Sequence, residues 1–286
     1  MPTFDTPAPI TVTVNVPVAA VDIAASERTD TVVEVVPSHP SRPGDVAAAE
    51  ETQIDFGNGR LRVVQPRRLR PPWFGDAGSV DVHISLPSGS DATGEMAAGS
   101  WRTTGSLGAC RITTASGDIE LDEGGPVHLK SSSGAISARL VTGLAELTTG
   151  SGAIRVGTLE GPGVLKNANG ETVIGEVAGE LRMHAGNGDV AVERAGAGVV
   201  VKAGRGNVRL GAVSEGKVAV ASGYGKIEVG VVDGVAVWLD LATGYGEVVN
   251  ELDPSTKPDG NETKVEVRAR TGYGDVAIRR AAAATI

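Results

Sequence analysis

A glycine-centred motif recurs at nearly constant spacing and constrains the fold of this 286-residue chain more than any other feature. In typical copies, such as Ser116-Gly117-Asp118-Ile119 and Asn187-Gly188-Asp189-Val190, a small or polar residue precedes the glycine and a β-branched residue follows two positions later. The motif glycines are Gly117, Gly134, Gly152, Gly170, Gly188, Gly206, Gly225, Gly246 and Gly274, separated by 17, 18, 18, 18, 18, 19, 21 and 28 residues. Such a period is typical of a solenoid, whose repeats bury their apolar sides only by stacking on their neighbours.

Each period contains two short apolar alternations. One follows the glycine, as at Val190 and Val192, and the second comes about nine residues later, as at Val199 and Val201. Alternation at every second residue indicates a strand with one face inward, and no apolar stripe with a helical period is present. The glycines let the chain turn a tight corner in each coil. The sequence therefore predicts an all-β solenoid with coils of about 18 residues.

The predicted interior can be listed as one column of equivalent positions. In chain order it contains Ile119, Ile136, Ile154, Thr172, Val190, Val208, Ile227, Val248 and Val276, with Thr172 as its only polar member. We expect the coils to stack in the same order as they follow in the chain.

The first 98 residues also alternate, but without the regular period. Segments 10–16, 32–36, 53–56, 61–64 and 80–86 are predicted strands, and 37–49 and 66–76 are predicted loops. We interpret residues 1–98 as an N-terminal β cap with the opening coils, 99–280 as the regular solenoid and 281–286 as a C-terminal tail. A separate N-terminal domain is the alternative. The longest glycine interval is expected to contain a loop at 252–262.

Composition and charge exclude several classes of protein. The formal net charge of −9 disfavours nucleic acid as a partner, because phosphate binding needs concentrated positive charge. The single cysteine, Cys110, excludes an internal disulfide and a cysteine-rich zinc site. The N-terminus lacks the pattern of a secretory signal, and the most apolar stretch, 229–242, is interrupted by Asp233 and Asp240. We expect a cytoplasmic protein with no membrane partner.

The chain resembles the DUF4097 family of bacterial β-strand-repeat proteins, which is often labelled adhesin-like. The resemblance rests on the motif series, on the segment 82–90 and on the closing Thr271-Gly272-Tyr273-Gly274-Asp275-Val276-Ala277-Ile278. The resemblance spans nearly the whole chain. It implies a single-stranded, right-handed parallel β-helix without established catalytic residues.

Two sets of residues are candidates for partner binding. Tyr224, Tyr245 and Tyr273 each lie between two glycines, and on stacked coils they would form an exposed aromatic ladder for a glycan or an apolar protein surface. The alternative is that they only cover the corner of the final coils. The second set is Arg67 and Arg68 with Trp73 and Phe74, which could contact an acidic partner or anionic lipid, or simply fold onto the solenoid wall.

Enzymatic and metal sites are not expected. Acidic residues follow several motif glycines, as at Asp118, Asp189 and Asp275, but the spacing differs from that of calcium-binding β-rolls and fits a solvated edge. The four histidines lie far apart in the repeat, and no catalytic Ser-His-Asp set, nucleotide loop or zinc spacing is present.

Three hypotheses for function remain, none requiring a cofactor. The first is a non-catalytic scaffold that binds a protein or a glycan. The second is a structural protein that self-associates into filaments, and the third is a carbohydrate-binding or carbohydrate-active β-helix.

Overall fold

The computed structural model describes residues 1–66, 78–252 and 264–281, which form a β-helix with one helix in the described part of the chain. The chain divides into two compact units, residues 1–138 and 139–286, and each is described by itself. The boundaries expected at residues 98 and 280 stay a prediction, and residues 282–286 of the expected tail lie outside the described part.

The second unit contains two strands per coil. They are β14 (Ala145–Ser151), β15 (Ile154–Leu159), β16 (Gly163–Asn169), β17 (Thr172–Val177), β18 (Leu181–Asn187), β19 (Val190–Ala195), β20 (Val199–Arg205), β21 (Val208–Val213), β22 (Gly216–Tyr224), β23 (Ile227–Val231), β24 (Ala236–Tyr245), β25 (Val248–Asn250), β26 (Lys264–Tyr273) and β27 (Val276–Arg280). Each strand pairs in parallel with its equivalent one coil away, so that Val190 lies opposite Val208. The predicted solenoid with coils of 18 residues is confirmed, whereas its right hand stays a prediction.

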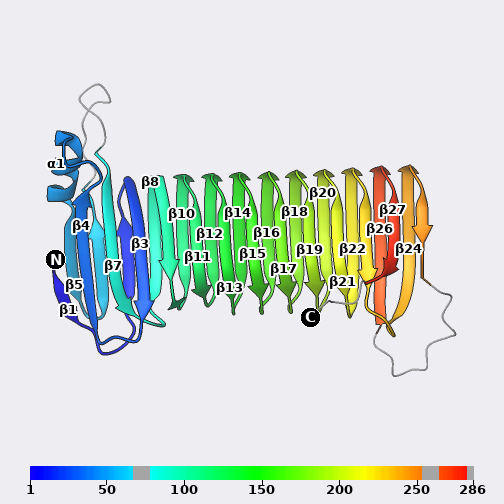
Figure 1. The fold of residues 1–286 in the computed structure, drawn as a ribbon, viewed down its shortest axis with the longest axis horizontal. Helices are drawn as coiled ribbons and strands as arrows, with labels where there is room; N and C mark the ends of the chain where they lie inside the picture. The colour runs from blue at the N-terminus through cyan, green and yellow to red at the C-terminus, as the bar shows by residue number, and fades with distance from the viewer. Residues whose placement is uncertain (67–77, 253–263, 282–286) are drawn as a thin grey trace. The chain divides into compact units, whose positions relative to one another are not determined.

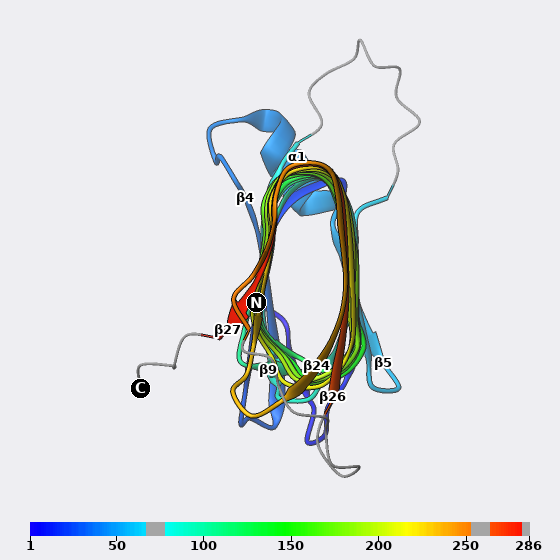
Figure 2. The same cartoon turned by 90° about the vertical axis from the view of Figure 1, so that its right-hand side faces the viewer.

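The coils of this unit superpose as two long walls joined by tight corners (Figure 2). The even-numbered strands form one wall and the odd-numbered strands form the other. At the corner, the motif glycines have φ between +132° and +155°. A Cβ on Gly188 would also collide with the carbonyl oxygen of Gly170 in the preceding coil. Both the φ value and the close stacking therefore require glycine here.

The order of the last two coils differs from the prediction. β26 pairs with both β22 and β24, and β27 pairs with both β23 and β25. In Figure 1 the red strands β26 and β27 accordingly lie between the yellow β22 and the orange β24. The last glycine interval, from Gly246 to Gly274, exceeds the 18-residue period by ten residues. At about 3.3 Å per extended residue, this extra length is enough for the chain to return from the coil of β24 and β25 to the coil position before it. The interior column of this unit therefore ends in the order Ile227, Val276, Val248.

The first unit contains the irregular opening part. Its strands are β1 (Thr3–Asp5), β2 (Thr11–Asn15), β3 (Val18–Ser26), β4 (Asp30–Pro37), β5 (Gln53–Gly57), β6 (Arg60–Val64), β7 (Val80–Pro87), β8 (Asp91–Thr104), β9 (Ser106–Leu107), β10 (Cys110–Ser116), β11 (Ile119–Gly124) and β12 (Val127–Ser133), while β13 (Ile136–Val141) contains the division between the units. β8 pairs in parallel with β2 through its first half and with β3 through its second half, so it contributes to both walls.

Among the described strands of this unit, three pairings are antiparallel: β1 with β4, β4 with β7 and β5 with β6. The rings of Phe4 in β1 and Phe56 in β5 stack with their centroids 4.8 Å apart. These elements end the parallel ladders on this side, because an antiparallel outer strand does not continue the coil pattern.

The predicted loop at 37–49 contains a helix instead, α1 (Pro43–Glu51). Pro43 occupies the first helical turn, where its fixed φ and missing N–H are tolerated, and Ala47, Ala48 and Ala49 follow with high helix propensity. Ala48 is buried. Prolines and Gly44 are typical of a loop, but Pro43 at the first turn of α1 acts as a helix start signal.

Candidate functional site

The second unit carries a continuous row of planar side chains on one corner, at the position directly before the motif glycine. In stacking order the row contains Asn169, Asn187, Arg205, Tyr224, Tyr273 and Tyr245, and we call it the planar ladder. The Asn187 amide donates to Oδ1 of Asn169 at 2.9 Å. The guanidinium carbon of Arg205 lies 5.8 Å from the ring centroid of Tyr224, within the range of a cation–π contact.

The structure brings the three predicted tyrosines together. The Tyr224 and Tyr273 centroids are 4.9 Å apart with an interplanar angle of 3°, and those of Tyr273 and Tyr245 are 4.8 Å apart at 7°. This spacing matches the distance between neighbouring strands, so the sheet itself sets the stack. The relative exposures of Tyr224, Tyr273 and Tyr245 are 52%, 48% and 69%.

The stacking decides which parts of the rings can meet a partner. Both faces of Tyr273 are covered by rings, and Arg205 lies over Tyr224. The outer face of Tyr245 carries no ring contact within the described chain. A partner therefore meets a row of ring edges and hydroxyl groups, with one aromatic face at the end.

The residues directly after the motif glycines have a structural role. Oδ1 of Asp189 accepts the backbone N–H of Asn207 at 2.7 Å, and Oδ1 of Asn207 accepts that of Lys226 at 2.9 Å. Asp118 and Asp275 accept the backbone N–H of the same position in a neighbouring coil in the same way. These side chains connect neighbouring coils. Within residues 1–66, 78–252 and 264–281, no cluster of three metal-ligating side chains forms.

Sequence reasoning missed a second, buried polar column three residues before the motif glycine. In the first unit these residues are Thr114 and Ser131, and in the second they are Thr149, Asn167, Ser222, Thr271 and Thr243; all are directed inward, and all but the half-buried Thr243 are buried. The hydroxyls of Thr271 and Thr243 donate to the carbonyl oxygens of Gly225 and Gly274 at 3.0 and 2.8 Å. These bonds satisfy carbonyl groups at the tight corner. The signal was present, because Ser, Thr or Asn occupies this position in seven of nine periods.

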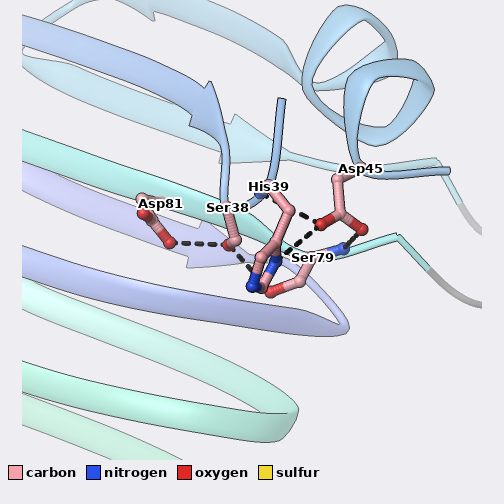
Figure 3. A network of polar contacts seen from close by, with 5 residues as sticks. All are labelled: Ser38, His39, Asp45, Ser79 and Asp81. Atoms are coloured by element: carbon pink, nitrogen blue, oxygen red, sulfur yellow. Dashed lines mark hydrogen bonds and ion pairs between the residues drawn. The ribbon is translucent and has the colours of Figure 1, made fainter. Parts of the chain in front are cut away.

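A polar network in the first unit joins α1 to the start of β7 (Figure 3). The Asp45 carboxylate accepts hydrogen bonds from Nδ1 of His39 at 3.1 Å and from the backbone N–H of Ser79 at 3.0 Å. The Ser38 hydroxyl donates to the Asp81 carboxylate at 2.6 Å. The hydroxyl oxygens of Ser38 and Ser79 lie 2.9 Å apart. Neither serine hydroxyl is hydrogen-bonded to the His39 ring in the part of the chain that the structure describes. The arrangement therefore lacks the serine–histidine contact of a catalytic triad and holds α1 in place.

Asp45 makes this network sensitive to acid. Its pKa is lowered, mainly by the backbone N–H of Ser79 and further by the bonds from His39. A lowered folded-state pKa contributes stability that is present above the unfolded-state pKa, about 4, and is lost as the pH falls through the folded-state value. We predict that Asp45→Asn is less stable than the parent at pH 7 and that the difference shrinks below about pH 4. Hydrogen exchange of the α1 amides in both proteins, followed from pH 7 to below pH 4, measures this difference in stability. A difference that stays constant over this pH range would contradict the prediction.

The first unit also contains the chain's only cysteine and an open groove. Burial raises the pKa of the Cys110 thiol to about 12, so the thiol is not a nucleophile at neutral pH. The groove, of about 540 Å³, is lined in part by Val16, Pro17, Gln65 and Met96. Oε1 of Gln65 is buried and has no hydrogen-bond partner among the described residues. The second predicted binding set, Arg67, Arg68, Trp73 and Phe74, lies outside the described residues.

No helix in the described ranges is long and apolar enough to cross a bilayer.

No family model and no curated protein matches the sequence. Two solved structures are similar along nearly the whole chain. One is described as a putative cell adhesion protein from Clostridium sporogenes, with 11% identity, 98% of each chain covered and a TM-score of 0.22. The other is described as a putative adhesin from Bacteroides fragilis, with 12% identity, 97% of this chain and 95% of that chain covered, and a TM-score of 0.26. Likenesses this low carry no functional conclusion, and membership of the DUF4097 family stays a prediction.

Proposed function

We propose that this protein is a non-catalytic scaffold that binds a protein partner at the tyrosine end of its planar ladder. The observation that supports it is the stack of Tyr224, Tyr273 and Tyr245, whose rings remain about half or more exposed. Tyrosine is enriched at protein interfaces because it offers a large, rigid apolar area and a hydroxyl at low entropic cost. A corner that needed only covering would use smaller side chains, as the serines at the same position of earlier coils do.

A protein partner fits this surface better than a glycan. Sugars stack on open aromatic faces, and here the ring faces are mostly occupied by Arg205 and by the neighbouring rings. The tyrosine hydroxyl groups instead form a row of hydrogen-bonding groups that repeats from strand to strand. Lys226 and Glu247, which follow the motif glycines, add charged groups beside this row. Glycan binding is the competing outcome of the experiment below.

The absence of catalysis is part of the proposal. It is supported by the engaged hydroxyls of Ser38 and Ser79 and by the protonated Cys110 thiol. The filament alternative has less support, because the antiparallel outer strands β1 and β5 do not offer a ladder for parallel end-to-end growth. The cytoplasmic location also stays a prediction, which fractionation of cells tests.

The test places a photo-crosslinking amino acid at position 245 and, as a control, at the exposed Val200 in the same unit. We expect a specific adduct with a different protein only from position 245. With that partner purified, replacing all three tyrosines with serine should weaken binding tenfold or more, at roughly 1.4 kcal/mol per factor of ten, as expected for aromatic interface residues.

Leu144→Ser and Val200→Ser, two other exposed apolar positions, are the matched controls and should bind as the parent does. Unchanged melting of all variants separates binding effects from folding effects. Equal binding by the triple variant, or binding of a glycan on an array but of no protein, would refute the proposal.

A further inference from the structure

The outermost coil of the second unit has an open strand edge. Within the described residues, β24 pairs only with β26 and β25 pairs only with β27, whereas β26 and β27 are paired on both sides. Backbone N–H and C=O groups on the other edge of β24 and β25 therefore lack strand partners in the described chain. A free edge of this kind is a template for a further strand.

The apolar interior is also open at this coil. Val248 is 47% exposed, although Val276 at the same position of the neighbouring coil is fully buried. Leu239 and Leu241 are half-buried, whereas their partners in β26, Val267 and Ala269, are fully buried. One further layer would bury these side chains, as every inner coil of the unit buries those of its neighbour.

The described strands of this edge lack two features that normally prevent strand addition. The thirteen residues of β24 and β25 include no lysine and no proline. Their single charged residue, Asp240, is paired with Arg270 at 3.1 Å. Natural edge strands are usually protected by lysine, proline, bulges or a covering element. The composition of this coil favours contact with another chain.

We propose that the coil formed by β24 and β25 binds the same coil of a second copy of this protein, giving a closed pair related by a two-fold axis. A single added strand would cover only one wall, whereas a second copy brings two strands at the separation of the two walls. The facing interior side chains Val237, Leu239, Leu241 and Val248 are uncharged, so two copies meet without burying like charges. The free face of Tyr245 lies at the same end.

The two-fold axis fixes the geometry of the pair. Identical ends that meet in this way pair their strands antiparallel, and the contact is complete after two copies, so no filament grows. The thirteen strand residues from each copy are fewer than the 20–30 of a standard interface, so we expect a dissociation constant of roughly micromolar order. The pair is independent of the proposed tyrosine-ladder partner, because it uses the strand edges and interior of the end coil.

The experiment is sedimentation velocity of the full-length protein from sub-micromolar to high micromolar concentration. We expect a monomer at the lowest concentrations and a dimer, without larger species, at the highest. Val248→Lys should abolish the dimer, because its ammonium group would be buried between the copies. Val249→Lys is the matched control, since Val249 is the adjacent residue on the outward face, and it should leave the dimer intact.

Hydrogen exchange of the unsubstituted protein keeps the test decisive if Val248→Lys fails to fold. The amides of β24 and β25 should become more protected as the concentration rises. A monomer at all concentrations would overturn the proposal, whether these amides exchange fast or are covered by residues of the same chain. Continued growth into polymers, or equal dimerisation of both lysine variants, would also overturn it. Position 245 lies in β24, so a crosslinked adduct with a second copy of this protein counts for the pair, whereas only an adduct with a different protein supports the tyrosine-ladder partner. With the adducts separated in this way, the two proposals fail separately.

Discussion

Replacing Gly188 with alanine is expected to destabilise the second unit strongly, by roughly 3 kcal/mol or more. The residue has φ +132°, which costs a residue with a Cβ about 1–2 kcal/mol. In addition, the new Cβ would overlap the carbonyl oxygen of Gly170, a backbone atom that cannot move without shifting the neighbouring coil. Chemical denaturation with the midpoint and slope measured together tests the expectation.

Gly196→Ala is the control for this prediction. Gly196 lies in the same unit, its φ is not in the left-handed range, and the nearest atoms to a built Cβ are 3.6 Å away, an ordinary contact. Here alanine should be neutral or should stabilise by about 0.4–1 kcal/mol, because it restricts the unfolded chain. If both variants lost the same stability, the special role assigned to the motif corner would be wrong.

The glycine period could be predicted because it follows from strictly local requirements. A corner with positive φ recurs at the same point of every coil, and the strands on either side show their inward faces by alternation. The course of the final coils could not be read in the same way. Val248 and Val276 both match the inward pattern, and nothing local in their motifs tells which coil stacks on Ile227. That choice depends on the length of the connection and on pairing between distant strands.

The candidate site shows the same limit. The sequence identified Tyr224, Tyr245 and Tyr273, since their position before the motif glycine is periodic, but not their order in the stack. The open edge at β24 was not predicted either, because it results from the inverted order of the coils. Ser131, Asn167 and Thr271 were overlooked for another reason. Alternation shows where apolar residues lie, whereas these three are buried polar residues that hydrogen-bond to backbone carbonyl groups.

Asn167→Asp is expected to be the most damaging substitution that preserves side-chain shape. Nδ2 of Asn167 lies 3.1 Å from the carbonyl oxygen of Gly152, 3.0 Å from that of Gly170 and 3.2 Å from that of Glu171, and the residue is buried. Aspartate would direct a carboxylate oxygen at these three acceptors, without a donor to compensate. A buried polar group that loses its partners costs about 1–3 kcal/mol, and a charged group costs more. We therefore expect a loss of about 3 kcal/mol or more in the free energy of unfolding, measured by denaturation at pH 7.

Two further substitutions separate this explanation from a general sensitivity of the coil. Asn169→Asp makes the same chemical change two residues away, on the exposed corner, where Oδ1 already accepts the Asn187 amide at 2.9 Å. It should cost much less than Asn167→Asp, because a carboxylate accepts that bond equally well and the substitution removes only one exposed bond, from Nδ2 of Asn169 to the Gly150 carbonyl at 3.3 Å. Asn167→Thr introduces the residue found at the equivalent position of four other coils, at Thr114, Thr149, Thr243 and Thr271. It should cost less than aspartate, because its hydroxyl can donate to a corner carbonyl, as that of Thr271 does. Equal losses for Asn167→Asp and Asn167→Thr would show that the volume of the asparagine matters at this corner, and that the carbonyl groups of the glycines find their hydrogen bonds elsewhere.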